Sequence, residues 1–328
     1  MGNQHRLHFI RWLSELRRQD LLLVGGKAAN LGELCELDFP VPPGFCVTTE
    51  AFQYFAESIG LKSEVSAAMS ALNIDDYQQL WKTSQALRAF VRSHGIPAEI
   101  EREILEAYQI LSENNEEPAW VAVRSSATSE DLSEASFAGQ LDTYLNLRGG
   151  QSVIAAVLKC WAGLFTERVI LYRQKKAGFS RTDASMGVVV QEMVDATRSG
   201  VMFTMHPVTK DHSKILIEAT IGLGEALVGG AATPDTYLVD KATLEVVEQH
   251  VGTKKRVVLR NPVGGGVIRI ETPQGQERKP CLSTAEVQRI AELGRRIEAE
   301  YGNTPQDIEW AIGDSVPYIL QTRPVTGL

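Results

Sequence analysis

The chain has 328 residues, of which 44% are hydrophobic and 23% are charged, a composition typical of a folded globular protein. Its formal net charge is -8 at pH 7, which argues against binding to nucleic acid, because such binding needs clustered positive charge. No apolar run approaches the roughly 20 residues of a membrane-spanning helix. We therefore expect neither a nucleic acid nor a membrane as a partner.

The four cysteines lie far apart, at Cys35, Cys46, Cys160 and Cys281, and none belongs to a C-x-x-C pair. Neither a disulfide framework nor a zinc knuckle is indicated, so a reducing compartment fits best. The first 20 residues contain charges throughout and lack the apolar core of a secretory signal. We expect a cytoplasmic protein.

Helical periodicity dominates the first half of the chain. Apolar residues recur at spacings of three and four over residues 51–59, 61–72, 76–94 and 97–113, and a longer amphipathic helix is expected over 152–176. Short extended segments are expected at residues 21–24, 44–48 and 119–124. Together these elements predict a mixed α+β fold.

The later part of the sequence is rich in strand patterns. Strands are expected at residues 187–194, 200–204, 214–219, 236–240 and 255–259, and one helix is expected over 284–301, after a Ser283 cap. This change from helix-rich to strand-rich patterns predicts a subdomain boundary near residue 185. We expect a helix-rich N-terminal lobe, residues 1–185, and a β-rich C-terminal lobe, residues 186–328.

Residues 21–32 read LLLVGGKAANLG, which predicts a strand, a glycine turn, Lys27 and then a helix. Backbone N–H groups of such a turn and of the helix N-terminus can bind an anion, and Lys27 adds a cation for a phosphate. The spacing of the glycines and the lysine differs from that of a Walker A loop. A turn of this kind can also be purely structural.

A second candidate phosphate site follows the apolar strand that ends at Arg124. Small hydroxylated residues come directly after it, and a glycine-containing loop follows at residues 136–143. A planar guanidinium beside hydrogen-bond donors can bind a polyphosphate, over which the loop can close. The alternative is an ordinary surface arginine before a helix that Thr128 caps.

The strand over residues 188–194 offers a candidate adenine site. Its apolar run breaks at Gln191 and Glu192, which Met193 and Val194 follow. An adenine ring needs a flat apolar slot with a backbone donor and acceptor at its edge, and a strand end or an interdomain linker can provide both. Most strands of this kind bind nothing.

Residues 307–323 predict a β-hairpin with a five-residue turn over 313–317. A turn symmetric about Ser315 places Glu309 opposite Gln321, Trp310 opposite Leu320 and Ile312 opposite Tyr318. One face of this hairpin is then expected in the core, with the side chains of Ile308, Trp310, Ile312, Tyr318 and Leu320.

The opposite face of the expected hairpin gathers the polar side chains of Asp307, Glu309, Gln321 and Arg323. Glu309 and Gln321 place a carboxylate and an amide oxygen within reach of one hard cation, with the Arg323 guanidinium one step along the strand. Oxygen ligands for Mg²⁺ beside a phosphate-binding arginine are what a nucleoside triphosphate site requires. A solvated hairpin face with an ion pair is the alternative.

Seven segments stand in the order and at the spacing of one enzyme family: LVGGKAANLGEL, VPPGFCVTTEAF, VRSSATSEDLSEASFAGQLDTYLN, CWAGLFTERVILYR, SGVMFT, GLGEALVGG and ILQTRP. Over nearly its whole length the chain resembles the ATP-binding domain of phosphoenolpyruvate synthase, of rifampin phosphotransferase and, more distantly, of pyruvate phosphate dikinase. The resemblance implies an ATP-grasp-like α+β fold of two lobes with ATP in the cleft between them. It also implies phosphate-binding and lid segments in the first lobe, and adenine and metal-binding segments in the second.

The resemblance further implies a role for each candidate residue. Lys27, Arg124 and Arg323 would contact phosphates as the catalytic residues, and Glu309 and Gln321 would bind Mg²⁺. The other nucleotide contacts would come from a lid segment, from the adenine-lining strand end and from one ribose or metal-side residue: Gly139, Gln140, Asp142 and Thr143; Gln191, Glu192, Met193 and Val194; and Glu218.

The activity implied by the resemblance is that of a phosphohistidine dikinase. ATP would donate a pyrophosphoryl group to a histidine on a partner domain or subunit and release AMP, on the way to phosphorylating pyruvate or a similar small molecule. The family enzymes carry that histidine on a swivelling domain and bind the acceptor on a further domain. The candidate site contains no evident nucleophile, so we expect slow turnover of ATP by this chain without its partner.

Two alternatives stay open. One is the ATP-binding subunit of a split enzyme that acts on another acceptor, similar to phenylphosphate synthase or to rifampin phosphotransferase. The other is a non-catalytic module that senses ATP, although a sensor has no need of the full set of charged residues. One departure from the family pattern is His206, in FTMHP, where the family usually shows an acidic or amide residue.

Overall fold

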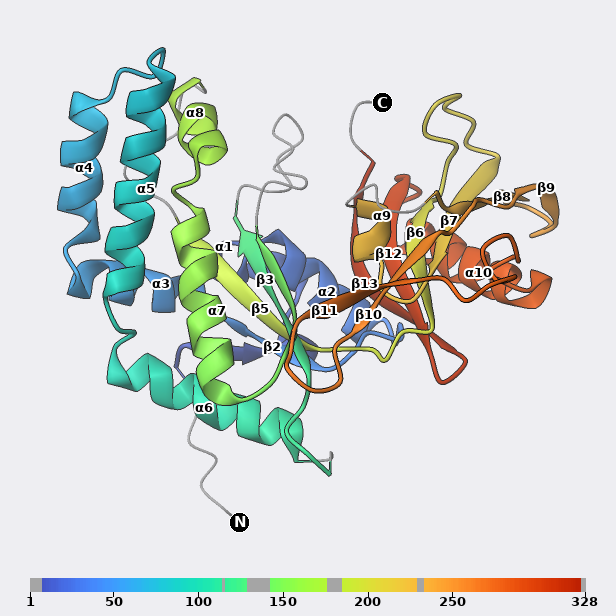
Figure 1. Cartoon of the computed structure of the whole chain (residues 1–328), viewed down its shortest axis with the longest axis horizontal. Coiled ribbons are helices and arrows are strands. Elements are labelled where there is room, and N and C mark those ends of the chain that lie inside the picture. Colours follow the sequence, from blue (N-terminus) through green and yellow to red (C-terminus); the bar gives the residue numbers. More distant parts are fainter. Residues whose placement is uncertain (1–7, 114–115, 129–141, 176–184, 229–232, 326–328) are drawn as a thin grey trace. The chain divides into compact units, whose positions relative to one another are not determined.

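The computed structural model describes residues 8–113, 116–128, 142–175, 185–228 and 233–325 (Figure 1). The chain forms two compact units. Unit 1 consists of Met1–Ala29 and Pro43–Glu192, and unit 2 consists of Asn30–Pro42 and Met193–Leu328. Both contain helices and sheet, so the predicted α+β class is confirmed.

Unit 1 is built on a five-stranded antiparallel sheet with the strand order β1-β2-β5-β3-β4. The strands are β1 (Ile10–Trp12), β2 (Gly44–Val47), β3 (Val121–Ala127), β4 (Thr143–Leu147) and β5 (Met186–Glu192). Strand β5 is central in this sheet, so it belongs to unit 1 although it follows the boundary near residue 185 that the sequence suggests.

Six helices of unit 1 include the four that the first half of the sequence predicts: α3 (Thr49–Ser58), α4 (Leu61–Ala71), α5 (Tyr77–Ser93), α6 (Ala98–Ser112), α7 (Gly150–Gly163) and α8 (Glu167–Lys175). Side-chain caps begin two of them, because Thr48 accepts from Ala51 N and Asp76 accepts from Gln79 N. The single helix predicted over residues 152–176 is wrong: it is interrupted after Gly163, a residue with low helix propensity.

The core of unit 1 lies between one face of this sheet and helices α3 to α7, which Figure 1 shows together on that side. Trp161 of α7 is fully buried and stacks on Phe55 of α3, with ring centroids 4.9 Å apart. Val121, Val123 and the neighbouring Val188 point into this core from β3 and β5. Alternate residues of these strands therefore face the other side of the sheet.

The strand predicted at residues 21–24 is wrong, because this segment is the short helix α1 (Leu21–Val24). Two 3-10 turns, Leu13–Glu15 and Arg18–Asp20, precede it, and α2 (Gly26–Glu36) follows after Gly25. Gly25 has a φ of 78°, and a Cβ there would lie 2.0 Å from the Ser126 carbonyl oxygen. Glycine is thus required by both the backbone angle and the close approach to β3.

Unit 2 is built on a six-stranded antiparallel sheet with the order β13-β12-β6-β7-β8-β9. Its strands are β6 (Arg198–Phe203), β7 (Lys214–Ile221), β8 (Asp235–Asp240), β9 (Val246–His250), β12 (Gln306–Gly313) and β13 (Val316–Pro324). The hairpin β10 (Arg256–Arg260) and β11 (Val267–Glu271) and the short α9 (Glu225–Val228) lie outside this sheet.

Helix α10 (Thr284–Glu300) packs against one face of the second sheet and forms the core of unit 2 with it. Its start confirms the predicted Ser283 cap, since Ser283 and Glu286 form a reciprocal capping box. Leu34 and Phe39 also lie in this core. Residues 30–42 therefore belong to unit 2, although most of the chain before residue 193 belongs to unit 1.

The predicted hairpin exists, but its turn differs from the expected one. Strands β12 and β13 are joined by only two residues, Asp314 and Ser315, whose φ values of 49° and 63° are those of a type I′ turn. Trp310 is consequently opposite Ile319, not Leu320. A bulge at Leu320 then restores the expected pairing, so Glu309 lies opposite Gln321 as predicted.

The two-residue turn also changes which residues of β13 are buried. Ile308, Trp310 and Ile312 of β12 lie in the core as predicted, with at most 2% of each exposed. On β13 the buried apolar residue is Ile319, whereas Tyr318 and Leu320 are only half-buried, so their expected burial is wrong.

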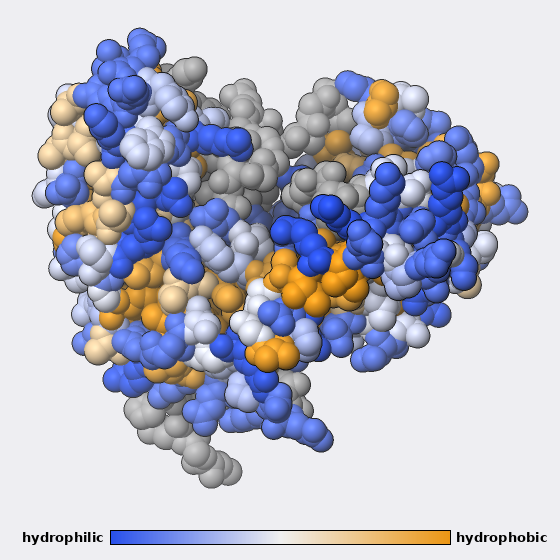
Figure 2. Space-filling model, viewed as in Figure 1, coloured by the Kyte–Doolittle hydropathy of each residue, from blue (hydrophilic) through white to orange (hydrophobic). Residues whose placement is uncertain are grey.

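The surface is mostly hydrophilic on the face that Figure 2 shows, with apolar patches separated by polar residues. Large exposed apolar side chains include Tyr77 and Trp81, one turn apart on α5. Among the described residues no helix combines the length and the apolar character needed to cross a bilayer.

A fully buried ion pair anchors the β10–β11 region to the second sheet. Lys254, just before β10, contacts the carboxylate of Asp235 at the start of β8, and neither side chain is exposed. Asp235 also accepts hydrogen bonds from Gly252 N at 2.9 Å and Cys281 N at 2.6 Å. Both charges are therefore compensated, and three segments distant in sequence meet at one carboxylate.

Asp235→Asn is expected to lower the free energy of unfolding by about 3–5 kcal/mol, because it leaves the Lys254 charge buried without its counter-charge. Denaturant unfolding followed by circular dichroism measures this loss. Lys214→Ala is the control, since it breaks a pair with Asp240 whose side chains are 25% and 27% exposed and should cost less than about 1 kcal/mol. Equal losses for the two variants would contradict the expectation.

Candidate functional site

Arg124, Thr143 and Gln191 share one face of the unit 1 sheet, the face opposite the helical core. Arg124 of β3 pairs with Thr143 of β4 and with Val189 of β5, and Gln191 lies two residues beyond Val189. Because side chains alternate along a strand, all three point to the same side. Arg124 and Gln191 are buried, with 8% and 2% exposed, whereas Thr143 is exposed.

The N-terminus of α2 lies over the same face, at the end of β3. Ala28 N donates to the Ser126 hydroxyl at 3.1 Å, and Ser126 is two residues beyond Arg124 on that face. Lys27 is the second residue of the helix, so the structure brings it to the end of the strand that carries Arg124. A helix N-terminus thus lies on the face that carries Arg124, an arrangement that attracts anions.

Asp142 points away from this face, unlike its neighbour Thr143. Its carboxylate accepts from the Tyr144 hydroxyl at 3.0 Å, and a Cβ on Gly163 of α7 would lie 3.3 Å from it. The pKa of the nearby Cys160 thiol is raised to about 12, mainly by burial; a hydrogen bond with Ser125 and the charge of Lys27 lower it, and the charge of Asp142 raises it. The Asp142 side chain therefore contacts the helical side of the sheet and does not join Arg124.

Four predicted site residues form or adjoin a row of polar groups across the second sheet. Glu309 of β12 pairs with Gln321 of β13 on one side and with Val201 of β6 on the other, and Val201 pairs with Glu218 of β7. Neighbouring strands are about 4.8 Å apart, so these side chains line one face. Arg323, two residues beyond Gln321, points to the same face, which is opposite the α10 core.

Asp307 lies on this face as well and orients Arg323. The arginine donates to one carboxylate oxygen of Asp307 through Nε at 2.9 Å and Nη2 at 2.6 Å. The sequence places Asp307 on this face without assigning it a role, although its spacing of two residues from Glu309 was the available signal. The structure identifies it as the partner that fixes the guanidinium.

Burial and mutual repulsion disfavour the ionised carboxylates of this face. Burial is the main cause that raises the pKa of Asp307; Glu309 raises it further and Arg323 lowers it. The pKa of Glu218 is also raised, first by burial and then by the charge of Asp307. A cation bound at this face would relieve the repulsion, because it offsets several negative charges at once.

The donor set of this face fits a hard cation. Glu309 and Gln321 offer a carboxylate and an amide oxygen from directly opposite strand positions, and Mg²⁺ commonly takes one or two protein oxygens while keeping waters and phosphate oxygens. Within the described residues no group of three or more His, Cys, Asp or Glu is arranged to hold a metal by itself. A bound metal here would consequently share its coordination with a substrate.

The predicted adenine segment spans the last residues of β5 and the first residues of unit 2. Glu192 N donates to Pro43 O at 2.9 Å, which continues the pairing of β5 with β2. Met193 packs against Leu223 and Val258. Val194 lies against Gly313, where a Cβ would come within 2.6 Å of its methyl group.

Two other predicted residues, Gly139 and Gln140, lie outside the described residues. His206 lies in a turn after β6, where its Nδ1 accepts from Val208 N at 3.3 Å and Thr209 N at 3.2 Å. An Asp or Asn side chain at a turn accepts backbone N–H groups in the same way. The histidine at this position thus acts as a local turn cap.

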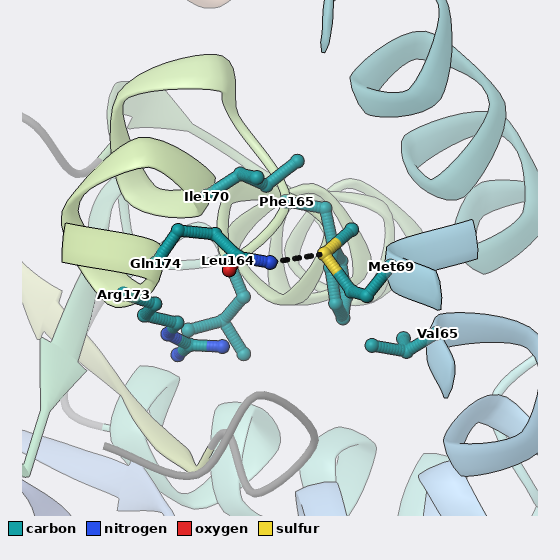
Figure 3. A pocket seen from close by; sticks show the side chains of 7 residues that line it. All are labelled: Val65, Met69, Leu164, Phe165, Ile170, Arg173 and Gln174. Carbon is teal, nitrogen blue, oxygen red and sulfur yellow. Dashed lines mark hydrogen bonds between the residues drawn. The ribbon is translucent and has the colours of Figure 1, made fainter. Parts of the chain in front are cut away.

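Neither of two surface pockets suits a nucleotide. The first, among α4, α7 and α8 (Figure 3), has a volume of about 10 Å³, room for about one water molecule. Its seven lining side chains include Met69, whose sulfur lies 3.7 Å from the Gln174 amide nitrogen, and Arg173, whose pKa burial lowers to about 10.

The second pocket is a broad depression of about 520 Å³ beside β9 and the start of α10. The charged groups that line it are the carboxylates of Glu245 and Glu248, which would repel a triphosphate. The polar sheet faces of the two units are therefore the better candidates for a phosphate and metal site.

Comparison with known proteins identifies the family of the chain. Residues 21–328 match the family described as pyruvate phosphate dikinase, AMP/ATP-binding domain. The chain is 42% identical to a probable phosphoenolpyruvate synthase of Pyrococcus abyssi and 44% identical to one of Methanothermobacter thermautotrophicus, over 98% of this chain in both cases. It is 38% identical to rifampicin phosphotransferase of Bacillus subtilis over 96% of the chain.

The matched region is only part of each relative. It covers 44% of the Pyrococcus protein, 46% of the Methanothermobacter protein and 36% of the Bacillus protein, so the chain spans less than half the length of these relatives. The polar sheet faces described above fall within the matched residues. The chain belongs to the pyruvate phosphate dikinase AMP/ATP-binding domain family, whose fold is ATP-grasp-like.

Proposed function

We propose that this chain is the Mg-ATP-binding part of a phosphohistidine dikinase. In this proposal ATP donates a pyrophosphoryl group to a histidine on a partner domain or subunit, AMP is released, and a small-molecule acceptor bound by a partner domain is phosphorylated later. The family membership and the two polar sheet faces support the proposal.

The observation that carries the proposal is the paired arrangement on β12 and β13. Glu309 lies opposite Gln321, and the Asp307–Arg323 ion pair lies one step along the same face. A hard cation and a polyphosphate need these two kinds of group side by side. A merely solvated hairpin face has no reason to bury Gln321 to 8% exposure or to place Asp307 where burial disfavours its ionised form.

The unit 1 face would contribute the other phosphate contacts. Arg124 lies in the middle of β3, and Lys27 belongs to the helix whose N-terminus contacts the end of that strand, so both could attract the negative oxygens of the triphosphate. Thr143 can add a hydroxyl donor beside Arg124. The lid role of Gly139 and Gln140 belongs to the proposal on the resemblance alone.

The nucleoside would be held by the segment that ends β5. Gln191 is 2% exposed on the Arg124 face, and Glu192, Met193 and Val194 follow it. The backbone just beyond β5 would contact an adenine edge, and Met193 offers an apolar surface beside Leu223. Glu218, in the row with Glu309, would make a ribose or metal-side contact.

Catalysis would depend on charge compensation during pyrophosphoryl transfer. A histidine nitrogen of the partner attacks the β-phosphorus, the bond from that phosphorus to the bridging oxygen breaks, and AMP leaves with the oxygen. Mg²⁺ held by Glu309 and Gln321 would offset phosphate charge. Lys27, Arg124 and an Arg323 already oriented by Asp307 would stabilise the charge that develops on the transferred and leaving groups, because they need no reorganisation.

The acceptor would be pyruvate or a similar small molecule, as the names of the synthase relatives suggest. The 38% identity to a rifampicin phosphotransferase favours an alternative in which the same ATP-binding part serves another acceptor. Supplying pyruvate or rifampicin to the chain together with a histidine-bearing domain of each relative, and following the phosphorylated product, distinguishes the two.

Mg-dependent ATP binding should be lost in Glu309→Ala. We expect the Mg-ATP affinity to fall at least about tenfold, or about 1.4 kcal/mol, because one of two protein ligands of the cation is removed. Isothermal titration calorimetry with Mg²⁺ and with EDTA separates the metal contribution from the rest. Glu248→Gln on the exposed β9 is the matched control and should leave the affinity unchanged; equal affinities for all three proteins would favour a solvated hairpin face.

The chain alone should produce AMP only slowly from Mg-ATP. Addition of a histidine-bearing domain should increase AMP formation by at least about 100-fold, or about 2.7 kcal/mol of barrier, because that domain supplies the nucleophile. Incubation with β-labelled ATP, followed by chromatography for AMP and by assay of an acid-labile phosphoprotein, measures both products. Rapid AMP production by the chain alone would refute the need for a partner, whereas ATP binding without any transfer would indicate a sensor.

Glu218→Gln should stabilise the ligand-free chain at neutral pH. The folded-state pKa values of Glu218 and Asp307 are raised, so the folded chain holds their protons more readily than the unfolded chain, and this stability is lost as the pH rises through the raised values. The variant lacks one of these charges and should melt about 1–3 °C higher at pH 7.5. Scanning calorimetry should show the gain shrinking below about pH 5, where carboxylates become protonated.

The control for this prediction is again Glu248→Gln, whose carboxylate is exposed on β9. It should melt like the original chain at both pH values. A lower melting temperature for Glu218→Gln at pH 7.5 would mean that Glu218 makes a favourable contact in the ligand-free state, and that the repulsion on this face is not what limits its stability.

A further inference from the structure

The outer edge of β13 is closed by the segment that contains α2. Strand β13 is at the end of the second sheet, so one side of its backbone has no neighbouring strand in that sheet. The Asn30 amide donates from Nδ2 to the Thr322 carbonyl oxygen at 3.2 Å, and Ile319 N donates to Pro40 O at 2.8 Å. Buried edge groups need such partners, because water cannot reach them.

Thr322 lies between two residues of the proposed site. It stands between Gln321 and Arg323, and its own partner across the hairpin is Ile308, which stands between Asp307 and Glu309. Any displacement of the Thr322 backbone would therefore move the two neighbouring side chains relative to β12. The positions of Gln321 and Arg323 therefore depend in part on the hydrogen bonds of Thr322.

The side chain of Thr322 is held on the core side of the sheet. Its hydroxyl donates to Gln306 Oε1 at 3.1 Å, Gln306 N donates to the Thr204 hydroxyl at 2.8 Å, and all three residues are at most 1% exposed. Asn30 thus completes a buried polar network. Its amide holds β13 at the edge of the sheet, and the Thr322 hydroxyl holds the strand on the core side. Fully satisfied buried networks of this kind favour one arrangement of a core.

An asparagine at position 30 is energetically unfavourable by itself, because this position lies inside helix α2. Asparagine has a low helix propensity, and its amide is buried, with 8% of the residue exposed. Its backbone carbonyl accepts from the Tyr301 hydroxyl at 3.5 Å, which ties this turn of the helix to the end of α10. Asn30 follows Lys27 by three residues, so the residue that closes β13 belongs to the same helix as a proposed phosphate contact.

We propose that Asn30 is a positioning residue for the Mg-ATP site. Its amide sets the backbone of β13 at Thr322 and thereby the geometry of Gln321 and Arg323, without touching the nucleotide itself. This inference rests on the proposed function of that face, and its test is designed so that the two can fail separately.

Asn30→Ala removes the donor to Thr322, and Asn30→Asp keeps the volume but places an acceptor against the carbonyl oxygen. Both variants should lose at least about tenfold, or about 1.4 kcal/mol, in Mg-ATP affinity. Calorimetry with Mg²⁺ and with EDTA should place most of this loss in the metal-dependent part. Asn30→Asp carries the test if Asn30→Ala does not fold.

Lys241→Ala is the matched control for loss of stability. It breaks a mostly buried pair of unit 2, in which Lys241 Nζ lies 2.9 Å from a Glu298 oxygen and the side chains are 18% and 10% exposed, away from the polar face. It should lower the melting temperature by a similar amount and leave the Mg-ATP affinity within about twofold. An equal loss of affinity in Lys241→Ala would mean that general destabilisation explains the effect.

Hydrogen exchange of the β13 backbone provides a readout that does not depend on nucleotide. Exchange in the peptide that contains residues 316–325 should speed up in both Asn30 variants and not in Lys241→Ala. If the original chain binds Mg-ATP and Asn30→Ala binds it equally well, the positioning role is overturned and the proposed function stands. If the original chain does not bind Mg-ATP, the proposed function fails, and with it a role for Asn30 beyond holding the strand edge.

Discussion

Repulsion among carboxylates on a half-buried sheet face is the constraint around which unit 2 is organised. Asp307 and Glu309 lie two residues apart on β12 and Glu218 lies on β7, all on one face, and burial together with their mutual charge raises the pKa of Glu218 and Asp307. A fold keeps such a face only if other interactions hold the strands in register. In unit 2 those interactions are the α10 core, the two-residue turn and the network behind Thr322.

The polar face of unit 1 carries positively charged residues, whereas the face of unit 2 is rich in carboxylates, and its structural basis differs. Lys27 and Arg124 come from a helix start and a strand that are about 100 positions apart, and the helix start reaches this strand because Gly25 allows it to approach the Ser126 backbone. A side chain at position 25 would collide with β3, so the cationic face depends on this glycine as much as on the two charged residues.

The sequence predicted the pairing that matters most, between Glu309 and Gln321, although it predicted the wrong turn. The two-residue turn shifts the register by one position, and the bulge at Leu320 shifts it back, so the two differences cancel before Glu309 is reached. The alternation of apolar residues along β12 also predicted correctly which side of this strand is buried. Tyr318 and Leu320 were wrongly expected in the core because the turn has two residues and not five, whereas the bulge, which tertiary packing sets and the local pattern does not mark, restores the pairing at Gln321.

Other differences arise where packing overrides a local pattern. The apolar run at residues 21–24 resembles a buried strand, yet Leu22 is 77% exposed and the segment is a helical turn that leads into Gly25. The sequence also grouped Asp142 with Thr143, whereas the structure turns the Asp142 carboxylate toward Tyr144 on the other side of the strand. Asn30 gave no signal beyond being an unfavourable residue for a helix interior, because its partner is nearly 300 positions away.

The early segment that seals β13 makes unit 2 discontinuous in the chain. Residues 30–42 leave the ribosome long before the final hairpin, and until then Leu34 and Phe39 have no core to enter. The core of the second unit can therefore form only after the final hairpin has been synthesised. A fragment that begins at residue 193 would lack residues 30–42. It would expose the apolar surface that these residues cover and the unpaired edge of β13, and unpaired strand edges can pair with strands of other molecules.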